Sequence, residues 1–464
     1  MVTSKTFLVA AALLLALAAA QAIEVTPAQQ AFRQIYQELV EINTTDSIGD
    51  TAKAAEAMAA RLRTAGLADV QVLSSGPRKG NLVARLRGTG ARRPILLIAH
   101  IDVVEAKRED WDSDPFKLEE VNGQFRARGS IDDKAMASAF VANLIEYAKE
   151  GFHPDRDIIV ALTTDEELSD SPHDGAHWLL QNHRPLIDAE FAINEGGGGS
   201  LRDGKPARLS VQLAEKVYQS YRLEVTDPGG HSAAPRPDNA IYRLAQALAR
   251  LAQFEFPISL NDVTRAYFAR VASAERPDVA SAIAALLAGN DHSLARLTQS
   301  PTNNALLRTT CVATMLSAGE AENALPQTAR ATVNCRLMPG QAAGEVEAAL
   351  NRAINDPKVA VTPIGQAVES PPSPINPEVM QAVERISSEM WPGVPVIPTM
   401  SGGYTDSRWL RNAGIAAYGV SGLFSDAGSN GVHGRNEHVG VQQVYDCKEF
   451  LYRLVKALAG GGQK

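Results

Sequence analysis

Residues Pro94-Ile95-Leu96-Leu97-Ile98-Ala99-His100-Ile101-Asp102 join a continuous apolar run to a polar pair. A run this short and this uniformly apolar predicts a strand with both faces buried. Two more such runs follow at 157–163 (DIIVALT) and 191–194 (FAIN), and an amphipathic helix is predicted over 134–149. Strands that alternate with helices indicate an α/β fold with a mainly parallel sheet. Ligands of such sheets bind beyond the carboxyl ends of the strands.

Polar side chains follow each of the three predicted strands. His100 and Asp102 are two positions apart on an extended chain, so they face the same way and Asp102 can orient the imidazole. Taken alone, this pair fits a histidine of the core equally well. The second run ends at Asp165-Glu166-Glu167 and the third at Glu195, which four glycines follow. Three consecutive carboxylates repel one another, and a bound dication would reverse that repulsion.

Two loops add residues of the same kind. Arg128–Lys134 (RGSIDDK) opens the predicted helix with Asp132 and Asp133. An acidic residue at a helix N-terminus is an ordinary helix cap, and this explanation accounts for only one of the two aspartates. Late in the chain, 432–437 (VHGRNE) places His433 in a loop. Histidines and carboxylates gathered at sheet ends are the ligand mixture of a zinc-type site.

The pattern of predicted helices and strands changes in the second half of the chain. Apart from a mostly helical stretch at 257–305, the predicted elements follow a β-α-β-β-α-β order. The strands are expected at 217–226, 309–316, 329–337 and 359–364, and the helices at 239–253 and 343–354. A proline-rich stretch at 370–374 then reads as a linker back to the first unit. We expect a catalytic domain over 23–212 and 369–464 and an inserted domain over 213–368.

The first 22 residues predict a signal peptide. Lys5 is followed by an apolar run over 7–20 and by the small-x-small site Ala20-Gln21-Ala22, so the mature chain is expected to start at Ile23. The apolar run is short for a membrane span, although an uncleaved anchor is the alternative. We expect an exported protein that is periplasmic or secreted.

Composition excludes several classes of protein. The 464 residues carry a formal charge of −8, so no basic field favours nucleic acid as a partner. Three cysteines cannot form a disulfide framework, and their odd number leaves at least one thiol unpaired in a monomer. The 45% hydrophobic content is ordinary for a globular protein with a substantial core.

Five of these motifs occur in an order that resembles one family. HIDVV, ARGSIDDK, TDEE, NEG and HGRNE follow one another as in the co-catalytic zinc metallopeptidases, which include aminoacylase, carboxypeptidase S, acetylornithine deacetylase, succinyl-diaminopimelate desuccinylase and bacterial glutamate carboxypeptidase. The resemblance implies two divalent ions, with zinc as the expected metal. The implied metal ligands are His100, Asp132, Glu167, Glu195 and His433, with Asp132 bridging. Glu166 resembles the general base, and Asp102 would orient His100.

The same resemblance assigns residues outside the metal centre. His231 in the turn Pro228–Ser232 (PGGHS) resembles a histidine that stabilises the oxyanion, often across a dimer interface, which suggests a homodimer through the inserted domain. Asn323 and Arg336 resemble groups that hold the substrate carboxylate, which suits an arginine fork. Gly403 lies in a glycine loop resembling one that lines the substrate pocket. Glu105 and Ala135 depart from the family pattern, which leaves substrate preference open.

One further motif is a competing candidate. His173 and His177 have the i, i+4 spacing of a helical zinc site. Pro172 and Gly175 weaken a helix there, and Asp174 stands where such sites carry glutamate.

Two classes of function remain to be separated. The leading reading is a hydrolase that cleaves an amide bond next to a free carboxylate, releasing a C-terminal amino acid from small peptides, with N-acyl-amino acids as the alternative substrates. The rival is a non-catalytic exported binding protein of the same fold. Such a protein would be expected to lose ligands or the base, whereas all of these positions are filled here.

Overall fold

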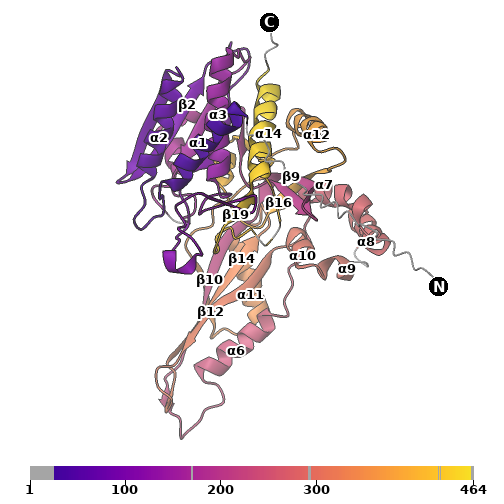
Figure 1. Ribbon diagram of the computed structural model, residues 1–464. Coiled ribbons are helices and arrows are strands. Elements are labelled where there is room, and N and C mark those ends of the chain that lie inside the picture. Colours follow the sequence, from indigo (N-terminus) through magenta and orange to yellow (C-terminus); the bar gives the residue numbers. More distant parts are fainter. Residues whose placement is uncertain (1–25, 169–170, 291–293, 427, 429, 461–464) are drawn as a thin grey trace, which may run out of the picture.

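The computed structural model describes residues 26–168, 171–290, 294–426, 428 and 430–460 (Figure 1). The predicted signal peptide and cleavage site lie outside the described residues. A large sheet with the strand order β1-β2-β6-β3-β7-β17-β9-β8-β18 forms the upper unit, and β16 pairs with β9 beside this path. Its strands are β1 (Asp69–Gly76), β2 (Lys79–Leu86), β3 (Ile95–His100), β6 (Ile158–Thr163), β7 (Phe191–Asn194), β8 (Gly199–Arg202), β9 (Lys205–Glu215), β16 (Val396–Ser401), β17 (Ala416–Gly419) and β18 (Phe424–Ser425).

The centre of the large sheet is parallel, as the buried apolar runs predicted. β3 pairs in parallel with β6 and β7, and β7 with β17. Leu97 belongs to one hydrophobic cluster and its neighbours Leu96 and Ile98 to another on the opposite face. Both faces are therefore buried, which explains why the run 95–99 is continuously apolar. The expected α/β class with a mainly parallel sheet is confirmed.

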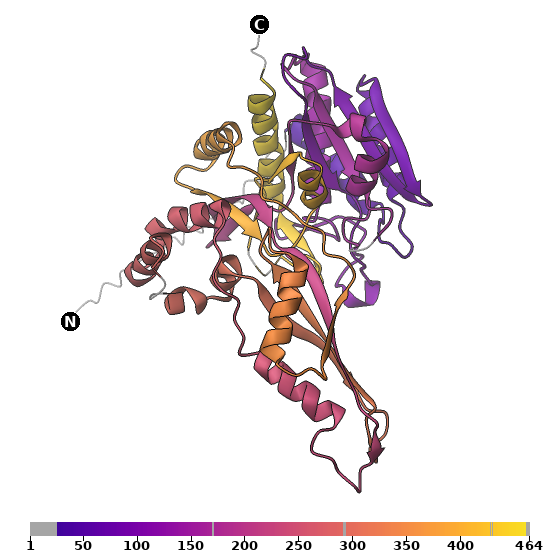
Figure 2. The ribbon, with the colours of Figure 1, turned by 180° about the vertical axis from the view of Figure 1, so that it is seen from behind.

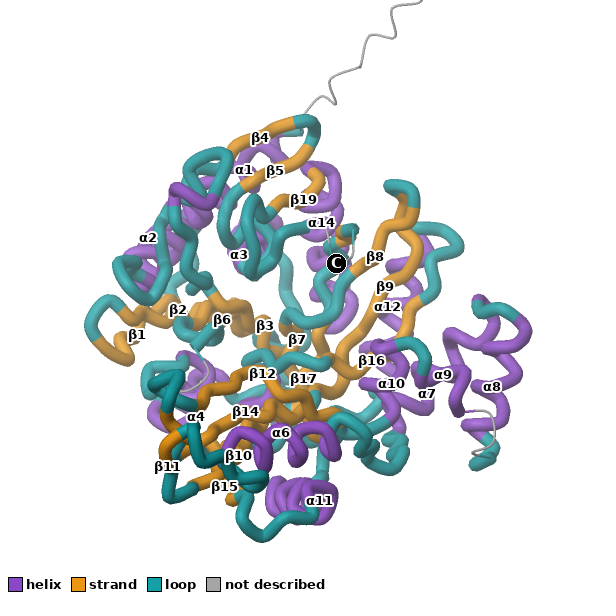
Figure 3. The backbone as a smooth tube through the Cα atoms, turned by 90° about the horizontal axis from the view of Figure 1, so that it is seen from below, coloured by secondary structure: helices purple, strands orange, loops and turns teal. Residues whose placement is uncertain are grey.

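Helices cover both faces of this sheet (Figure 3). One face carries α1 (Pro27–Glu41), α2 (Thr51–Thr64), α3 (Lys134–Glu150), α12 (Pro377–Met390) and α14 (Val441–Ala459), and the other α4 (Gly175–Asn182), α5 (Arg184–Ile187) and α13 (Ser407–Asn412). α1 and α2 are separate helices, because the chain leaves the helical conformation over 42–50 and the Asp50 side chain caps α2. A small sheet of β4 (Glu119–Val121), β5 (Gln124–Arg126) and β19 (His438–Gly440) lies beside α1.

The inserted segment forms an arm that projects from the large unit (Figures 1 and 2). Its antiparallel sheet has the order β12-β14-β10-β15, and two helices cover one face. These elements are β10 (Val217–Thr226), α6 (Ala240–Leu251), β12 (Thr310–Ala318), β14 (Thr328–Leu337), α11 (Ala343–Ile354) and β15 (Ala360–Ile364), with a short ribbon of β11 (Gly230–His231) and β13 (Ala324–Leu325) near its end. We call this unit the lid. Its element order is the β-α-β-β-α-β order expected from the sequence.

The helical stretch inside the insertion joins the large unit. It consists of α7 (Asp262–Val271), α8 (Pro277–Leu287), α9 (Leu294–Thr298) and α10 (Pro301–Leu307). Phe268 and Leu307 share the hydrophobic cluster of the large sheet, not that of the lid. This stretch lies within the span 213–368, which was expected to form an inserted domain, and it packs against the large sheet. Among the described residues, no helix is both long and apolar enough to span a membrane.

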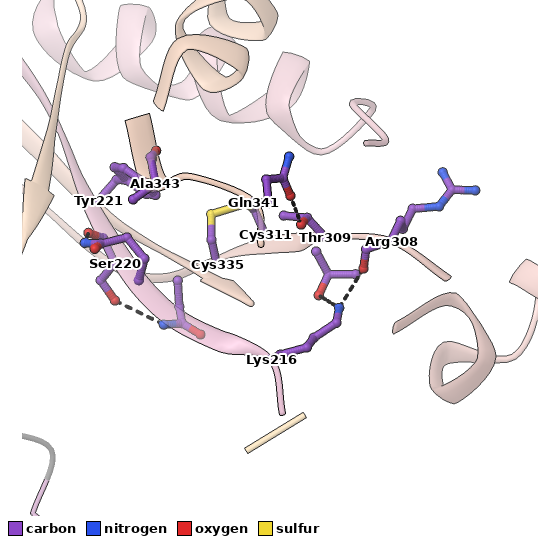
Figure 4. The surroundings of a disulfide bond; sticks show 12 residues. Lys216, Ser220, Tyr221, Arg308, Thr309, Cys311, Cys335, Gln341 and Ala343 are labelled. Carbon is purple, nitrogen blue, oxygen red and sulfur yellow. Dashed lines mark hydrogen bonds between the residues drawn. A yellow bond between two sulfur atoms is a disulfide. The ribbon is translucent and has the colours of Figure 1, made fainter. Parts of the chain in front are cut away.

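One disulfide joins two strands of the lid. Cys311 on β12 and Cys335 on β14 stand opposite each other in the sheet register, and their sulfur atoms are bonded (Figure 4). Cys447 is a free thiol buried in α14. This pairing is compatible with the odd cysteine count, which left at least one thiol unpaired.

Candidate metal centre and substrate cleft

The predicted metal ligands converge where the central parallel strands end. His100 ends β3, Glu166 and Glu167 follow β6, and Glu195 follows β7. The ligand atoms of His100, Asp132 and Glu167 all lie within 4.8 Å of one another, and so do those of His100, Glu166 and Glu195. Parallel strands bring their carboxyl ends to one edge, which is why residues so distant in sequence meet here. Their roles as ligands remain a prediction.

Asp132 lies between the two histidines. Its Oδ1 is 3.0 Å from Nε2 of His100, and its Oδ2 is 3.0 Å from Nε2 of His433. His433 Nε2 is also 3.0 Å from Oε1 of Glu167. Each oxygen of Asp132 therefore faces a different group of ligands, as a carboxylate that bridges two cations must. The side chain of His433 is 57% exposed, so the site opens to solvent on that side.

The three consecutive acids after β6 do not all face the site. Asp165 has a φ of 61° and turns its carboxylate to Lys79 Nζ at 2.7 Å and to the hydroxyl of Ser171 at 2.6 Å. Left-handed backbone at a residue other than glycine is strained, and these contacts hold it in place. The turn leaves Glu166 and Glu167 to contribute to the cluster, so the repulsion inferred from the sequence is partly relieved by Lys79.

Asp102 organises the site differently from the expectation. His100 Nδ1 lies 3.0 Å from the backbone carbonyl oxygen of Asp102 and 3.6 Å from its carboxylate. The carboxylate instead accepts hydrogen bonds from the backbone N–H groups of Glu166 and Glu167, at 3.2 and 3.1 Å. Asp102 therefore fixes the turn that carries the proposed base as well as the orientation of the imidazole.

The glycines after Glu195 have a structural explanation. The sequence suggested that they let the backbone pass close to something. Gly196 has a φ of 95°, and a Cβ there would collide with the Gln212 side chain, while one on Gly197 would collide with the carbonyl oxygen of Gly419. The close neighbours are thus parts of this chain, and the tight turn sets the position of Glu195.

The electrostatics of the cluster fit a cationic occupant. Burial and the Glu195 carboxylate raise the pKa of Glu166 well above its usual range, and burial also raises that of Glu195. Hydrogen bonds to Asp132 and Glu167 raise the pKa of His433 to about 10. Protons therefore compensate the carboxylates in the absence of metal, and bound dications would displace them. Imidazole and carboxylate donors are the set that zinc and related metals take.

Glu437 is a site residue whose role the sequence did not reveal. Its side chain is fully buried and accepts hydrogen bonds from the backbone N–H groups of Gly129, Ile131 and Asp132, at 2.7 to 3.2 Å. Arg128 also donates to it, at 2.8 Å. Glu437 thereby ties the loop of Asp132 to the loop of His433. The motif HGRNE contains this residue, but only the fold shows what it binds.

The loop 401–406 links the metal cluster to the lid. At its end, Asp406 is buried and accepts a hydrogen bond of 2.6 Å from the hydroxyl of Thr163, the last residue of β6. Burial and repulsion from Asp174 raise the pKa of Asp406 to about 8. Thr405 donates to the buried carboxylate of Glu215, which is paired with Arg411 at 3.1 Å. None of these acids was a candidate from the sequence.

Arg336 and Gly403 lie where this loop meets the lid. Arg336 Nη1 donates to the carbonyl oxygen of Gly402 at 3.1 Å, and its guanidinium stands 4.7 Å from the centre of the Tyr218 ring. Gly403 is exposed in the same loop. Within the described part of the chain, no carboxylate pairs with Arg336, so its charge is available to an anionic ligand.

His231 and Asn323 lie away from the cluster in this chain. Both are exposed. His231 ends β11 and Asn323 immediately precedes β13, and the Ser232 N–H donates to the Asn323 carbonyl oxygen at 3.0 Å. Roughly 26 Å of strand, at about 3.3 Å per residue, separates Thr328 near this ribbon from Arg336. The structure therefore does not bring these two residues to the other candidates within one chain.

The two histidines of the alternative pair contact other groups. His173 precedes α4 and its Nδ1 is hydrogen-bonded to the carbonyl oxygen of Ser75 at 2.6 Å. His177 stacks on Trp409 with 3.9 Å between the ring centres, and its Nε2 contacts Gln181. The two rings thus have separate partners, because Asp174 starts the helix between them.

Known proteins resemble this chain in sequence over most of its length. The N-fatty-acyl-amino acid synthase/hydrolase PM20D1 of Xenopus tropicalis is 30% identical over 375 residues, which cover 78% of this chain and 72% of the relative. The probable carboxypeptidase S-like 2 of Dictyostelium discoideum is 30% identical over 376 residues, covering 78% and 71%.

Solved structures share the fold at low sequence identity. The M20 family metallo-carboxypeptidase Sso-CP2 of Sulfolobus solfataricus matches with a TM-score of 0.69 at 17% identity, covering 92% of this chain and 99% of that one. The Bacillus subtilis protein YXEP, a dinuclear metal-binding peptidase of the M20 family, matches with a TM-score of 0.57 at 12% identity, covering 92% and 97%. The family model for peptidase family M20/M25/M40 matches residues 96–457. The chain therefore belongs to the M20/M25/M40 peptidase family, whose members are metallohydrolases of peptide and N-acyl-amino-acid bonds.

Proposed function

We propose that the protein hydrolyses the amide bond next to a free carboxylate and so releases a C-terminal amino acid from small peptides. The convergence of two histidines and several carboxylates around Asp132 carries this proposal. His100, Asp132 and Glu195 would hold one divalent ion, and Asp132, Glu167 and His433 a second. Bound metal would polarise the scissile carbonyl and lower the pKa of the attacking water.

The residues of the chain supply the remaining steps. Glu166 is 5% exposed, and its Oε1 has no hydrogen-bond partner among the described residues, so it is free to take a proton from water. It would then pass that proton to the leaving amine. Asp102 keeps the Glu166 turn in place. Arg336 would hold the carboxylate of the substrate through paired N–H donors.

We expect two divalent ions, with zinc as the metal, to be needed for activity. Metal analysis of the purified chain should find two ions, and a chelator should abolish turnover until zinc or cobalt is added back. Metal affinity should fall as the pH falls, because the metal must displace a proton from His433, whose pKa is about 10 without metal. Full activity with a single ion, or in excess chelator, would contradict the dinuclear site.

Replacing Arg336 with alanine should raise KM far more than it lowers the melting temperature. The change removes a charge-assisted contact to the substrate carboxylate, worth roughly 1.5–3 kcal/mol or about 10- to 150-fold in KM. Steady-state kinetics on acid and carboxamide forms of one substrate measure this directly. The loss should shrink for the carboxamide.

A second arginine provides the matched control for that experiment. Arg330 lies on the same strand and the same face as Arg336, but it pairs with Glu224. Arg330→Ala should therefore leave KM near the wild-type value. Equal losses for acid and carboxamide substrates would show that Arg336 supports the fold and does not bind the carboxylate.

N-acyl-amino acids are the second candidate substrates. Similarity to an N-fatty-acyl-amino acid synthase/hydrolase at 30% identity favours them, and the same carboxylate contact would serve both classes. A panel of dipeptides and N-acyl-amino acids, scored by released amino acid, separates the two. If the metal-loaded protein binds members of the panel without cleaving any, it is a binding protein and the hydrolase proposal fails.

Export and dimerisation complete the proposal. The disulfide between Cys311 and Cys335 supports an oxidising compartment, the destination expected from the N-terminal segment. The separation of His231 from the cluster supports a homodimer in which each copy supplies this histidine to the other.

A further inference from the structure

A cavity of about 370 Å³ lies at the base of the lid, next to the loop 401–406. Its walls come from the lid sheet, from the segment that follows β15, and from residues just after β16. The apolar and aromatic side chains that line it are Tyr218, Met315, Ile364, Val368 and Tyr404. This volume is within the range of pockets that enclose small ligands.

The cavity lies on the uncovered face of the lid sheet. The strand register places Tyr218 opposite Arg336, Ser220 opposite Ile364, and Met315 opposite Thr332, all on this face. The other face is buried beneath α6 and α11. An uncovered sheet face is normally polar, yet Met315 and Ile364 are 69% and 37% exposed here. Exposed apolar side chains around a hollow indicate a place where an apolar group binds.

The cavity adjoins the proposed carboxylate contact. Tyr218 lines the cavity and also lies under the Arg336 guanidinium, 4.7 Å from ring centre to Cζ. In an amino-acid substrate, the carboxylate and the side chain are attached to the same carbon atom. The amide nitrogen is attached to this carbon too, but its acyl carbonyl must reach the metal cluster, none of whose residues lines the cavity. The side chain is therefore the group left to enter the cavity.

The charges of the lining favour a neutral occupant. The cavity has no carboxylate among its lining residues, so a basic side chain would lack a counter-charge. The Arg408 guanidinium is engaged by Asp174 at 3.2 Å. The Lys216 amine donates to the Arg308 carbonyl oxygen at 2.6 Å (Figure 4). Burial lowers the pKa of Lys216 to about 7, which reduces its attraction for an acidic side chain.

We infer that this cavity receives the side chain of the released amino acid, and that the protein prefers substrates in which this side chain is aromatic or branched aliphatic. The inference rests on the proposed function, because it uses the amide substrate and the Arg336 contact. It adds a substrate class that the metal centre alone does not specify.

The test compares substrates that differ only in the released residue. N-acetyl derivatives of phenylalanine, leucine, alanine, aspartate and lysine are hydrolysed by the wild-type protein and by Ile364→Trp, which fills the cavity. The wild type should show a kcat/KM for leucine and phenylalanine at least about tenfold above that for alanine. Ile364→Trp should reduce this ratio by about tenfold or more. Ile375→Trp is the matched control, because Ile375 is similarly exposed, at 42%, but does not line the cavity.

Each outcome of this comparison has a distinct meaning. No hydrolysis of any derivative, with peptides also uncleaved, overturns the proposed function. Hydrolysis with equal rates for alanine and leucine, or with aspartate preferred, overturns the inference alone. An unchanged leucine-to-alanine ratio in Ile364→Trp, with the wild-type melting temperature retained, also overturns it. If Ile364→Trp does not fold, Ile364→Asp applies the same test, because a charge at this position should repel the apolar side chain.

Discussion

Replacing Glu166 with glutamine should lower kcat by about 10²–10⁴-fold while both metal ions stay bound. Glutamine preserves the size of the side chain and can still accept a hydrogen bond, but it cannot take a proton from the attacking water. The Glu166 backbone N–H would keep its bond to Asp102, so the turn should not move. Rates on the best substrate of the panel, together with metal content, measure both parts of this expectation.

Glu167 provides the comparison for that result. Its Oε1 contacts His433 Nε2, so Glu167→Gln should weaken one metal ion, and excess zinc should partly restore turnover. Replacing Glu166 should thus change the rate first, whereas replacing Glu167 should change the metal content first. If Glu166→Gln loses metal while Glu167→Gln retains both ions without turnover, the two roles are reversed.

Glu437→Gln should lower the free energy of unfolding by about 3–5 kcal/mol, the usual effect of removing one partner from a buried ion pair. The Arg128 side chain is only 3% exposed and would be left as a buried charge without its carboxylate. The amide would also be a poorer acceptor for the N–H groups of Gly129, Ile131 and Asp132. Chemical denaturation of the metal-loaded protein measures the change.

A double-mutant cycle tests whether the charge is the cause. Arg128→Gln removes the other half of the pair, and the double variant should lose less stability than the two single variants together. Strictly additive losses would show that Glu437 acts only through the backbone groups. A loss below about 1 kcal/mol in Glu437→Gln would show that the buried pair does not stabilise the fold.

The central strands of the large sheet could be predicted, because short continuous apolar runs are typical of strands buried on both faces. The runs at 95–99 and 158–162 are buried on both faces, and this burial requires continuous apolar sequence. The edge of the sheet was harder to predict. β1, β8, β9 and β16 to β18 were not predicted. β17 contains Gly419, β16 contains Pro398, and β8 and β18 are only a few residues long. Their strand pairing depends on neighbours far away in the sequence.

Some residues of the candidate site could likewise be predicted from the sequence, and others could not. Residues that follow buried strands, such as His100 and Glu195, could be recognised from their position, and the resemblance to a family assigned His433. Asp406 and Glu437 could not be recognised, because their hydrogen-bond partners lie hundreds of residues away along the chain. Acidic residues are common in loops, and only tertiary contacts distinguish the buried ones. His231 was expected to act in the site, and within this chain it lies in the lid ribbon instead.

Early and late parts of the sequence pair with each other in the large sheet, and this determines when the site can form during biosynthesis. β16 and β17 pair with β9 and β7, and the loop of His433 closes on Asp132, so late segments complete a sheet that early segments begin. The ribosome adds roughly 5–20 residues per second, so roughly 15 to 60 seconds pass between the emergence of Asp132 and that of His433. Throughout that interval the nascent chain cannot assemble a working centre. The connectivity of the fold therefore makes this cluster one of the last parts of the molecule that can be completed.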